Sequence, residues 1–196
     1  MGSRETKKLA TRQGMIDAAA RLFAERGVDR TTMDDIARAA GTSRTSVFNY
    51  FGYKEMILCE IGARYVAEIA GSVAAAARRS PRQRLLGLVD MVAELATREP
   101  ELISPILREM THPDPTRRRQ AGDTMQYRDI VESSLDALEA TGRLRAPHRR
   151  RSYARMMVDM VAGTVVRAGD DFPHARLRAE LRRCVDLFLD GALRAV

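Results

Sequence analysis

The residues best suited to chemistry lie in one stretch, residues 32–54, TMDDIARAAGTSRTSVFNYFGYK. Arg44 can make a bidentate hydrogen-bond pair with O6 and N7 of guanine. Thr45 can bond a base edge or touch a thymine methyl, and Asn49 can pair with adenine or bind a phosphate. Phe48 offers an apolar contact, although it can equally pack inward. We therefore predict that Arg44, Thr45, Phe48 and Asn49 contact base edges of a DNA duplex.

The elements that must position these side chains are two short helices joined by a sharp turn. The first would begin at Thr32, whose hydroxyl can cap it while Asp35 completes a capping box. Gly41 can adopt the left-handed backbone that ends a helix, and Ser43 can cap the second helix. The residues expected to face inward are Ile36, Ala37, Ala40 and Val47. Two ordinary amphipathic helices are the alternative, but two caps, this small-residue spacing and a polar second helix together favour a helix-turn-helix.

This stretch and its flanks resemble the TetR (tetracycline-repressor-like) family of transcriptional regulators. Residues 15–37, MIDAAARLFAERGVDRTTMDDIA, resemble the family's opening helix, its glycine-terminated end and its entry into the second helix. Residues 48–58, FNYFGYKEMIL, resemble the segment that leads into the family's long linking helix. The resemblance therefore covers residues 9–58.

The resemblance implies an all-α fold, in which an N-terminal three-helix helix-turn-helix head is joined by a long helix to a helical ligand-binding and dimerisation body. It divides the chain into a DNA-binding domain, residues 1–53, and an effector-binding and dimerisation domain, residues 54–196. It also implies phosphate-backbone contacts for four side chains, Thr32, Ser46, Tyr50 and Lys54.

Basic residues gather at the N-terminus, where Arg4, Lys7, Lys8 and Arg12 are opposed only by Glu5. Such an arm can be a solubilising tail, or it can reach phosphates or the minor groove beside a recognition helix. We favour phosphate contacts for Lys7, Lys8 and Arg12 because the helix-turn-helix follows them. The formal net charge of +7 agrees with a polyanionic partner but is weak support by itself, since basic proteins are common.

The remaining composition is typical of a helical protein, with 45% hydrophobic residues, 5% aromatic residues and no apparent strand pattern. Cys59 and Cys184 form neither a CxxC pair nor a metal-like cluster with the three histidines, so we expect no metal and no cofactor. No apolar run approaches the roughly 20 residues of a membrane span, and no secretory signal is visible. These features predict a soluble, cytoplasmic protein with no membrane contact.

Beyond the head, the sequence indicates a series of helices separated by breaks that contain proline or glycine. A long helix from Lys54 to about Arg79 would link the head to the body. Further helices are expected at about residues 82–97, 101–111, 115–141, 148–168 and 174–194.

The last two of these helices carry broad apolar stripes at helical spacing. Periodicity shows only that each helix buries one face. The resemblance implies that the two helices pair with their copies in a four-helix dimer interface. The expected interface residues are Met156, Met157, Met160, Val161, Val165, Leu181, Val185, Phe188 and Leu189.

The middle helices resemble the family's ligand-binding region in position only. The residues expected to line an apolar cavity are Met91, Leu95, Ile103, Ile106, Leu107, Met110, Met125 and Tyr127. Ordinary core packing is favoured for any single one of them, because Met and Leu at helical spacing fill cores everywhere. Together they mark the region in which an unknown small-molecule effector, apolar or amphipathic, would bind.

The features of the head predict a sequence-specific DNA-binding transcriptional regulator, and the family resemblance implies a ligand-responsive repressor that binds a palindromic operator as a homodimer. A helical adaptor that uses the head to bind protein is the alternative, and it would lack salt-sensitive, sequence-selective DNA binding. An enzyme is disfavoured, because the sequence contains no nucleophile–base set, no phosphate-cradling glycine loop and no metal-like spacing.

Overall fold

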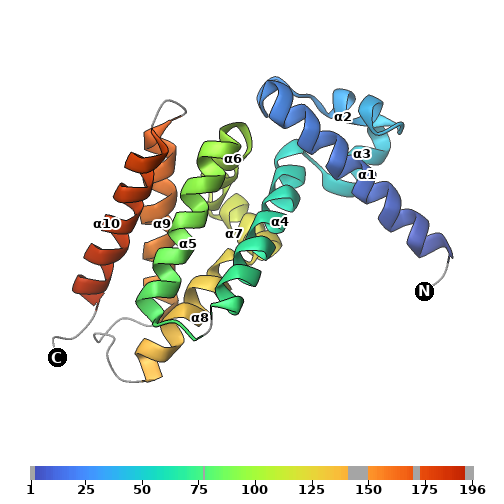
Figure 1. The fold of residues 1–196 in the computed structure, drawn as a ribbon. Helices are drawn as coiled ribbons and strands as arrows, with labels where there is room; N and C mark the ends of the chain where they lie inside the picture. The colour runs from blue at the N-terminus through green and yellow to red at the C-terminus, as the bar shows by residue number, and fades with distance from the viewer. Residues whose placement is uncertain (1–2, 77, 141–149, 170–172, 193–196) are drawn as a thin grey trace.

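The computed structural model describes residues 3–76, 78–140, 150–169 and 173–192. These residues form ten α-helices and no strand, which confirms the predicted all-α fold. Figure 1 shows a small head at the upper right and a larger helical body, with one long helix running from the head into the body. None of the helices in the described ranges combines the length and apolar character needed to span a bilayer.

The head consists of α1 (Ser3–Arg26), α2 (Met33–Ala39) and α3 (Arg44–Phe51). Its core is made by Phe23 of α1, Ile36 of α2 and Val47 of α3, each fully buried. The turn between α2 and α3 passes through Gly41, whose φ of +62° is the left-handed conformation predicted for it. The first helix is longer than expected, since it takes in the basic N-terminal residues from Ser3 onward.

The linking helix α4 (Lys54–Ala75) leads into α5 (Pro81–Arg98) and α6 (Pro100–Met110). Both α5 and α6 begin with a proline, whose fixed φ and missing N–H suit the first helical position. The helix α6 packs against α9 and α4 in the body and also reaches α1 of the head. A Cβ at Gly27, which follows α1, would lie only 3.0 Å from Glu101 Oε2 of α6, so head and body approach closely here.

The prediction of a single helix at residues 115–141 is wrong, because two helices occupy this stretch. They are α7 (Pro115–Met125) and α8 (Tyr127–Ala140), separated by Gln126 in a left-handed conformation with φ of 53°. The bend lets both Met125 and Tyr127 turn inward, where they are 2% and 8% exposed, while Gln126 stays in solvent. The free energy gained by burying Met125 and Tyr127 outweighs the backbone strain of Gln126 at positive φ.

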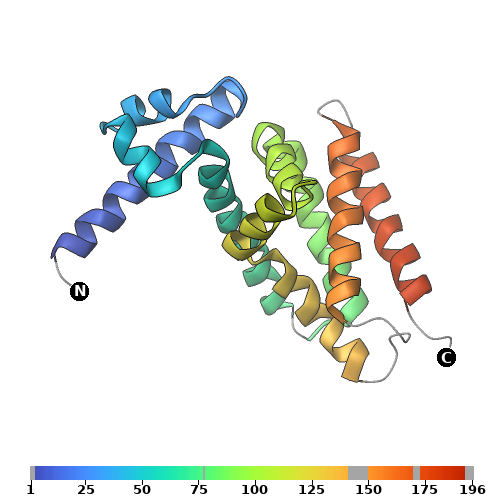
Figure 2. The same ribbon diagram turned by 180° about the vertical axis from the view of Figure 1, so that it is seen from behind.

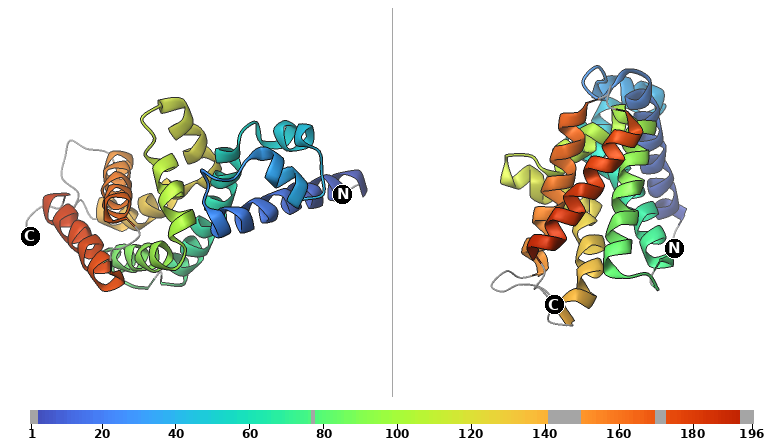
Figure 3. Two further views of the ribbon diagram at one scale, coloured as in Figure 1. Left: turned by 90° about the horizontal axis from the view of Figure 1, so that it is seen from above. Right: turned by 60° about the vertical axis from the view of Figure 1, so that its left-hand side comes forward.

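The last two helices, α9 (Arg150–Ala168) and α10 (His174–Ala192), lie side by side at one edge of the molecule in Figure 1 and face the viewer in Figure 3, right. The helix α10 also packs extensively against α5. Residues 77, 141, 148, 149, 193 and 194, which were included in the expected helices, lie outside the described residues.

The apolar stripes of α9 and α10 face inward, which corrects most of the expected dimer contacts. All of the predicted interface residues except Met156 and Met160 are buried within the single protomer. The ring of Phe188, for example, meets Tyr153 edge-on with centroids 5.8 Å apart. The stripes that periodicity identified therefore belong to the core of the body.

Candidate nucleic-acid interface and body cavity

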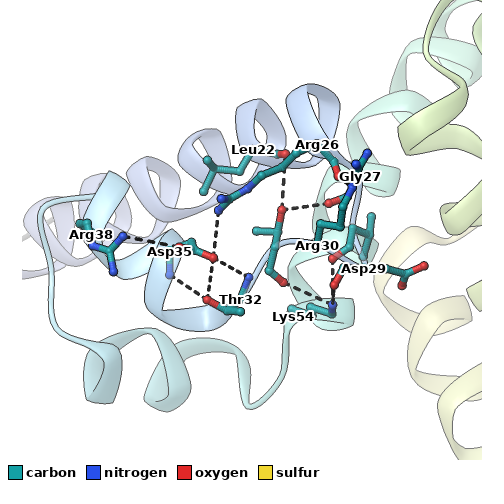
Figure 4. A network of polar contacts seen from close by, with 11 residues as sticks. Leu22, Arg26, Gly27, Asp29, Arg30, Thr32, Asp35, Arg38 and Lys54 are labelled. Atoms are coloured by element: carbon teal, nitrogen blue, oxygen red, sulfur yellow. Dashed lines mark hydrogen bonds and ion pairs between the residues drawn. The ribbon is translucent and has the colours of Figure 1, made fainter.

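The start of α2 is held by the predicted capping box (Figure 4). The Asp35 N–H donates to Thr32 Oγ1 at 3.2 Å, and the Thr32 N–H donates to Asp35 Oδ2 at 3.0 Å. Hydrogen bonds from the Thr32 hydroxyl and backbone N–H, with Arg26 nearby, lower the pKa of Asp35 to about 2. The ion pair of Asp35 with Arg26, at 2.9 Å, ties α2 to the end of α1.

Two side chains, Thr31 and Lys54, hold the connection between α1 and α2, and Figure 4 shows Lys54 beside it. Thr31, which is 1% exposed, donates its hydroxyl to the carbonyl oxygen of Gly27 at 2.9 Å. The Lys54 ammonium donates to the carbonyl oxygens of Val28 at 2.8 Å and Thr31 at 3.3 Å. Lys54 was expected to contact a DNA phosphate. In the structure its side chain instead joins the α1–α2 connection to the first turn of α4. Sequence reasoning missed Thr31.

The recognition-helix candidate α3 leaves its polar side open to solvent. Arg44, Thr45 and Asn49 are exposed. Phe48 is 40% exposed, so it does not pack inward, and the Arg44 guanidinium lies 5.3 Å from the centre of its ring. Arg44 also pairs with Asp34 of α2 at 3.2 Å, a contact that the sequence did not indicate. The four residues expected to contact bases therefore share one accessible surface.

The other expected phosphate contacts of the head lie at the ends of its helices. The Ser46 N–H donates to Ser43 Oγ at 3.1 Å, which is the predicted cap of α3. Thr32 is exposed, whereas Ser46 and Tyr50 are half-buried. The ring of Tyr50 lies 6.1 Å from that of Phe51, so Tyr50 also packs within the head.

The basic N-terminal residues form the first turns of α1, which project beyond the rest of the head (Figures 1 and 2). Lys7 and Lys8 are exposed on this projection. Arg12 instead pairs with Glu60 of α4, and its guanidinium lies 5.3 Å from the centre of the Phe51 ring. Arg12 thus ties α1 to α3 and α4.

The body contains an apolar cavity of about 80 Å³ that is lined by residues of α4, α5, α6, α8 and α9. All of the predicted lining residues except Met91 and Met125 contribute to its wall. Met91 is partly buried and packs against the core. Met125 packs against α4, where a Cβ at Gly62 would lie 2.5 Å from its sulfur.

Sequence reasoning missed the contributions of α4 and α9 to this cavity. The α4 residues are Gly62, Tyr65, Val66 and Ile69, and the α9 residues are Met157, Val158 and Val161. Their helical spacing was readable in the sequence, but it could not show which side of a core they line. One wall of the cavity is therefore the helix that carries the head.

A polar contact lies at the edge of this wall. The Tyr65 hydroxyl donates to the carboxylate of Glu99, at the junction of α5 and α6. Burial, and then the hydrogen bond with Glu99, raise the pKa of Tyr65 above its usual value. Across the described ranges, no group of three or more His, Cys, Asp or Glu side chains is placed to hold a metal ion.

Both parts of the chain match known families. Residues 15–61 match the family model described as bacterial regulatory proteins, tetR family. Residues 65–191 match the model of the C-terminal domain of TetR/AcrR family transcriptional repressors. The chain belongs to the TetR family. The resemblance found in residues 9–58 is thereby confirmed and extends through the body of this TetR-family protein.

Individual relatives are repressors and regulators. The crystal structure of Thermus thermophilus FadR, a TetR-family repressor in complex with lauroyl-CoA, is 32% identical, covers 94% of this chain and 96% of its own, and superposes with a TM-score of 0.83. The regulator BetI of Agrobacterium fabrum is 30% identical over 132 residues, 65% of this chain and 64% of BetI. The repressor KstR2 of Rhodococcus jostii is 41% identical over 64 residues, 33% of this chain and 31% of KstR2. These two curated relatives are thus matched over less than two thirds of their length.

Proposed function

We propose that this TetR-family protein is a transcriptional repressor that binds a palindromic operator as a homodimer and is released by a small-molecule effector. The observation that carries the proposal is the accessible polar side of α3, which is capped at Ser43 and braced by a buried core. A rigid, donor-rich helix end of this kind suits the major groove. The helical-adaptor alternative is not favoured, because the relatives are transcriptional regulators and repressors.

In this proposal Arg44, Thr45, Phe48 and Asn49 contact the bases. The phosphate contacts come from the ends of α2 and α3 and from the projecting turns of α1. They are Thr32, Ser46, Tyr50, Lys7 and Lys8. Arg12 and Lys54 position the helices through the contacts described above.

We infer that the effector carries a long apolar chain, and that a fatty acyl thioester of coenzyme A is the first candidate. The cavity wall is apolar apart from the tyrosine hydroxyls, and the Thermus relative was solved with lauroyl-CoA. A cavity of about 80 Å³ holds fewer carbons than the cavities of roughly 150 Å³ that take up benzene. A long chain must therefore push the walls apart, and α4 is one of them.

This displacement gives the proposed mechanism of release. The effector binds the widened body more tightly than the narrow one, and α4 carries the widening to the head, where it changes the separation of the two recognition helices. Operator affinity then falls by the same factor by which the operator weakens effector binding. The contact of α6 with Gly27 supplies a second connection between cavity and head.

We also propose that the dimer forms through the outer face of α9 and α10. The accessible residues of α9 and α10 outside the buried stripes include Met156, Met160, Gly163, Thr164, Cys184 and Leu187. Met156 is 46% exposed and Leu187 is 64% exposed, so both apolar side chains are accessible to a second copy of the chain. Gly163 and Thr164 are small enough to let another helix approach closely.

The test is selection of genomic fragments by the purified protein, followed by addition of lauroyl-CoA to the selected complex. We expect an inverted-repeat motif and loss of the complex as lauroyl-CoA is added. A selection that yields no motif at low salt would refute DNA-sequence recognition. A motif whose complex is indifferent to lauroyl-CoA would refute only the proposed effector.

A further inference from the structure

A second hollow, rich in arginine, opens beside the apolar cavity. It has a volume of about 390 Å³ and lies between α7, α8 and α9, which face the viewer in Figure 2. We call it the arginine cleft. Its guanidinium groups belong to Arg118, Arg119, Arg128, Arg151 and Arg155. Only two carboxylates line it, those of Asp123 and Asp159, so the cleft has a clear excess of positive charge.

The arginine cleft and the apolar cavity share part of their walls. Met110, Tyr127 and Val158 line both. The Tyr127 hydroxyl donates to the carbonyl oxygen of Met110 at 3.2 Å, so its polar end is already satisfied and its ring forms the partition. A single molecule that passes this partition would have one end among apolar side chains and the other among guanidinium groups.

Among the described residues, no guanidinium group of the cleft pairs with a carboxylate, although Arg118 donates to the carbonyl oxygens of His112 and Pro113. In the part of the chain that the structure describes, Arg119, Arg151 and Arg155 make no ion pair with a carboxylate. On α10, by contrast, Arg178 and Arg182 are each paired with Asp90. An excess of positive over negative charge in a hollow favours the arrival of an anion.

Gly122 leaves room for the side chain of Arg128, one of the cleft arginines. A Cβ at Gly122 of α7 would lie 2.6 Å from Arg128 Nη2, so only glycine lets this side chain cross here without shifting. Arg128 also lies 5.8 Å from the centre of the Tyr127 ring, at the partition. The backbone of α7 thus leaves room for the Arg128 side chain, which lies at the wall shared by the cleft and the cavity.

We propose that the arginine cleft binds the phosphate groups of the effector while its apolar chain enters the cavity. The proposal rests on the effector proposed above and extends it to the charged end of that molecule. Guanidinium groups match phosphate oxygens with paired, charge-assisted hydrogen bonds. A concave site of about 390 Å³ has the dimensions of a small-ligand site, whereas a duplex backbone is contacted by projecting side chains and helix ends.

The test uses the double variant Arg151→Gln, Arg155→Gln, which removes two charges from the α9 side of the cleft. Binding of lauroyl-CoA, dodecanoate and coenzyme A is measured by calorimetry on the full chain. We expect lauroyl-CoA affinity to fall by about tenfold to a hundredfold, and dodecanoate affinity to change by less than about twofold.

The matched control carries Arg78→Gln and Arg79→Gln, which change a pair of exposed arginines outside the cleft. This control should bind lauroyl-CoA as the wild type does. If the double variant unfolds, Arg119→Gln on α7 tests the opposite side of the cleft.

The outcomes separate this inference from the effector proposal. If both the double variant and Arg119→Gln bind lauroyl-CoA as tightly as the wild type does, the proposal that the arginine cleft binds the phosphates is refuted. The proposal of an acyl-CoA effector is then unaffected. Arginine-dependent binding of coenzyme A with no gain from the acyl chain would support the cleft and overturn the acyl effector. No binding of any of the three probes would overturn both. A lower salt dependence of operator binding in the double variant would make the cleft a DNA surface and overturn the inference.

Discussion

At the scale of single residues, Arg44 has an acidic neighbour that competes with DNA. Asp34 holds the guanidinium at 3.2 Å, and both side chains are half exposed, so the pair is weak but must open before Arg44 reaches a base. We expect Asp34→Asn to raise operator affinity by about two- to fivefold, because the competitor and its negative charge are removed. Fluorescence anisotropy measures the change, and Asp190→Asn on α10 is the control. Equal or lower affinity of Asp34→Asn would show that the pair orients Arg44 for binding.

Lys54 and Lys8 allow two roles of a lysine to be compared. The Lys54 ammonium is bonded to carbonyl oxygens between α1 and α2, whereas Lys8 is exposed on the projecting turns of α1. We expect Lys54→Ala to lower the melting temperature and leave the salt slope of operator binding unchanged. Lys8→Ala should leave the melting temperature unchanged and reduce the slope by about one phosphate. A reduced slope in Lys54→Ala would restore the phosphate contact implied by the family resemblance.

The residue types of the head predicted its helix caps but not the contacts between its helices. The sequence predicted the caps at Thr32 and Ser43 because these caps depend on neighbours three positions away. The pairing of Arg44 with Asp34 joins two helices, and the bonds of Lys54 join residues more than twenty positions apart. Such contacts follow from the crossing of helices, which no local pattern specifies.

At the scale of elements, α10 is fastened to α5 by charge. Asp90 accepts hydrogen bonds from Arg178 at 2.8 and 2.9 Å and from Arg182 at 2.6 and 2.7 Å. The hydrogen bonds from Arg182, and then those from Arg178, hold the pKa of Asp90 well below its ordinary value of 3.8. The ionised carboxylate therefore stabilises the fold above about pH 4, and this contribution is lost as the pH falls toward the lowered pKa.

We expect Asp90→Asn to lower the free energy of unfolding at pH 7 by about 1–2 kcal/mol, since the arginine side chains are half exposed and solvent weakens the pairs. The difference from the wild type should shrink as the pH is lowered below about 4. Urea denaturation at several pH values measures both effects. The control is Asp186→Asn, which removes a single exposed pair with Arg82 and should cost less than about 0.5 kcal/mol. A pH-independent loss in Asp90→Asn would assign its effect to packing.

Helix boundaries illustrate how far the sequence reaches at this scale. Pro81, Pro100 and Pro115 each begin a helix, as the breaks predicted, because proline acts locally. The break at Gln126 had no such signal, since its cause is the burial of Met125 and Tyr127 on different sides of a bend. The arginine cleft depends on this bend, because α7 and α8 meet there.

At the scale of the whole molecule, amphipathic periodicity located the core of the body but not its outer surface. An apolar stripe on a helix can face its own protomer or a partner, and the pattern is the same in both cases. In α9 and α10 the stripes fill the protomer, whereas Met156 and Leu187 remain exposed outside them. The cavity was easier to anticipate, because its lining from α5, α6 and α8 is part of the inward-facing core.

The proposed dimer places its interface on this outer face, and Leu187 is its most exposed large apolar side chain, at 64%. We expect Leu187→Glu to convert the dimer to a monomer in sedimentation velocity, because the variant would bring a carboxylate from each protomer into an apolar interface. Operator affinity should fall by more than about a hundredfold, since each half-site would then be bound by an independent head. The thermal stability of the single protomer should be preserved, because Leu187 contributes little to its core. Ala67→Glu, an exposed apolar position on α4, is the matched control and should leave assembly and operator binding intact. A dimeric Leu187→Glu variant would place the twofold axis on another face, and the distance between the two recognition helices would have to be derived anew from that face.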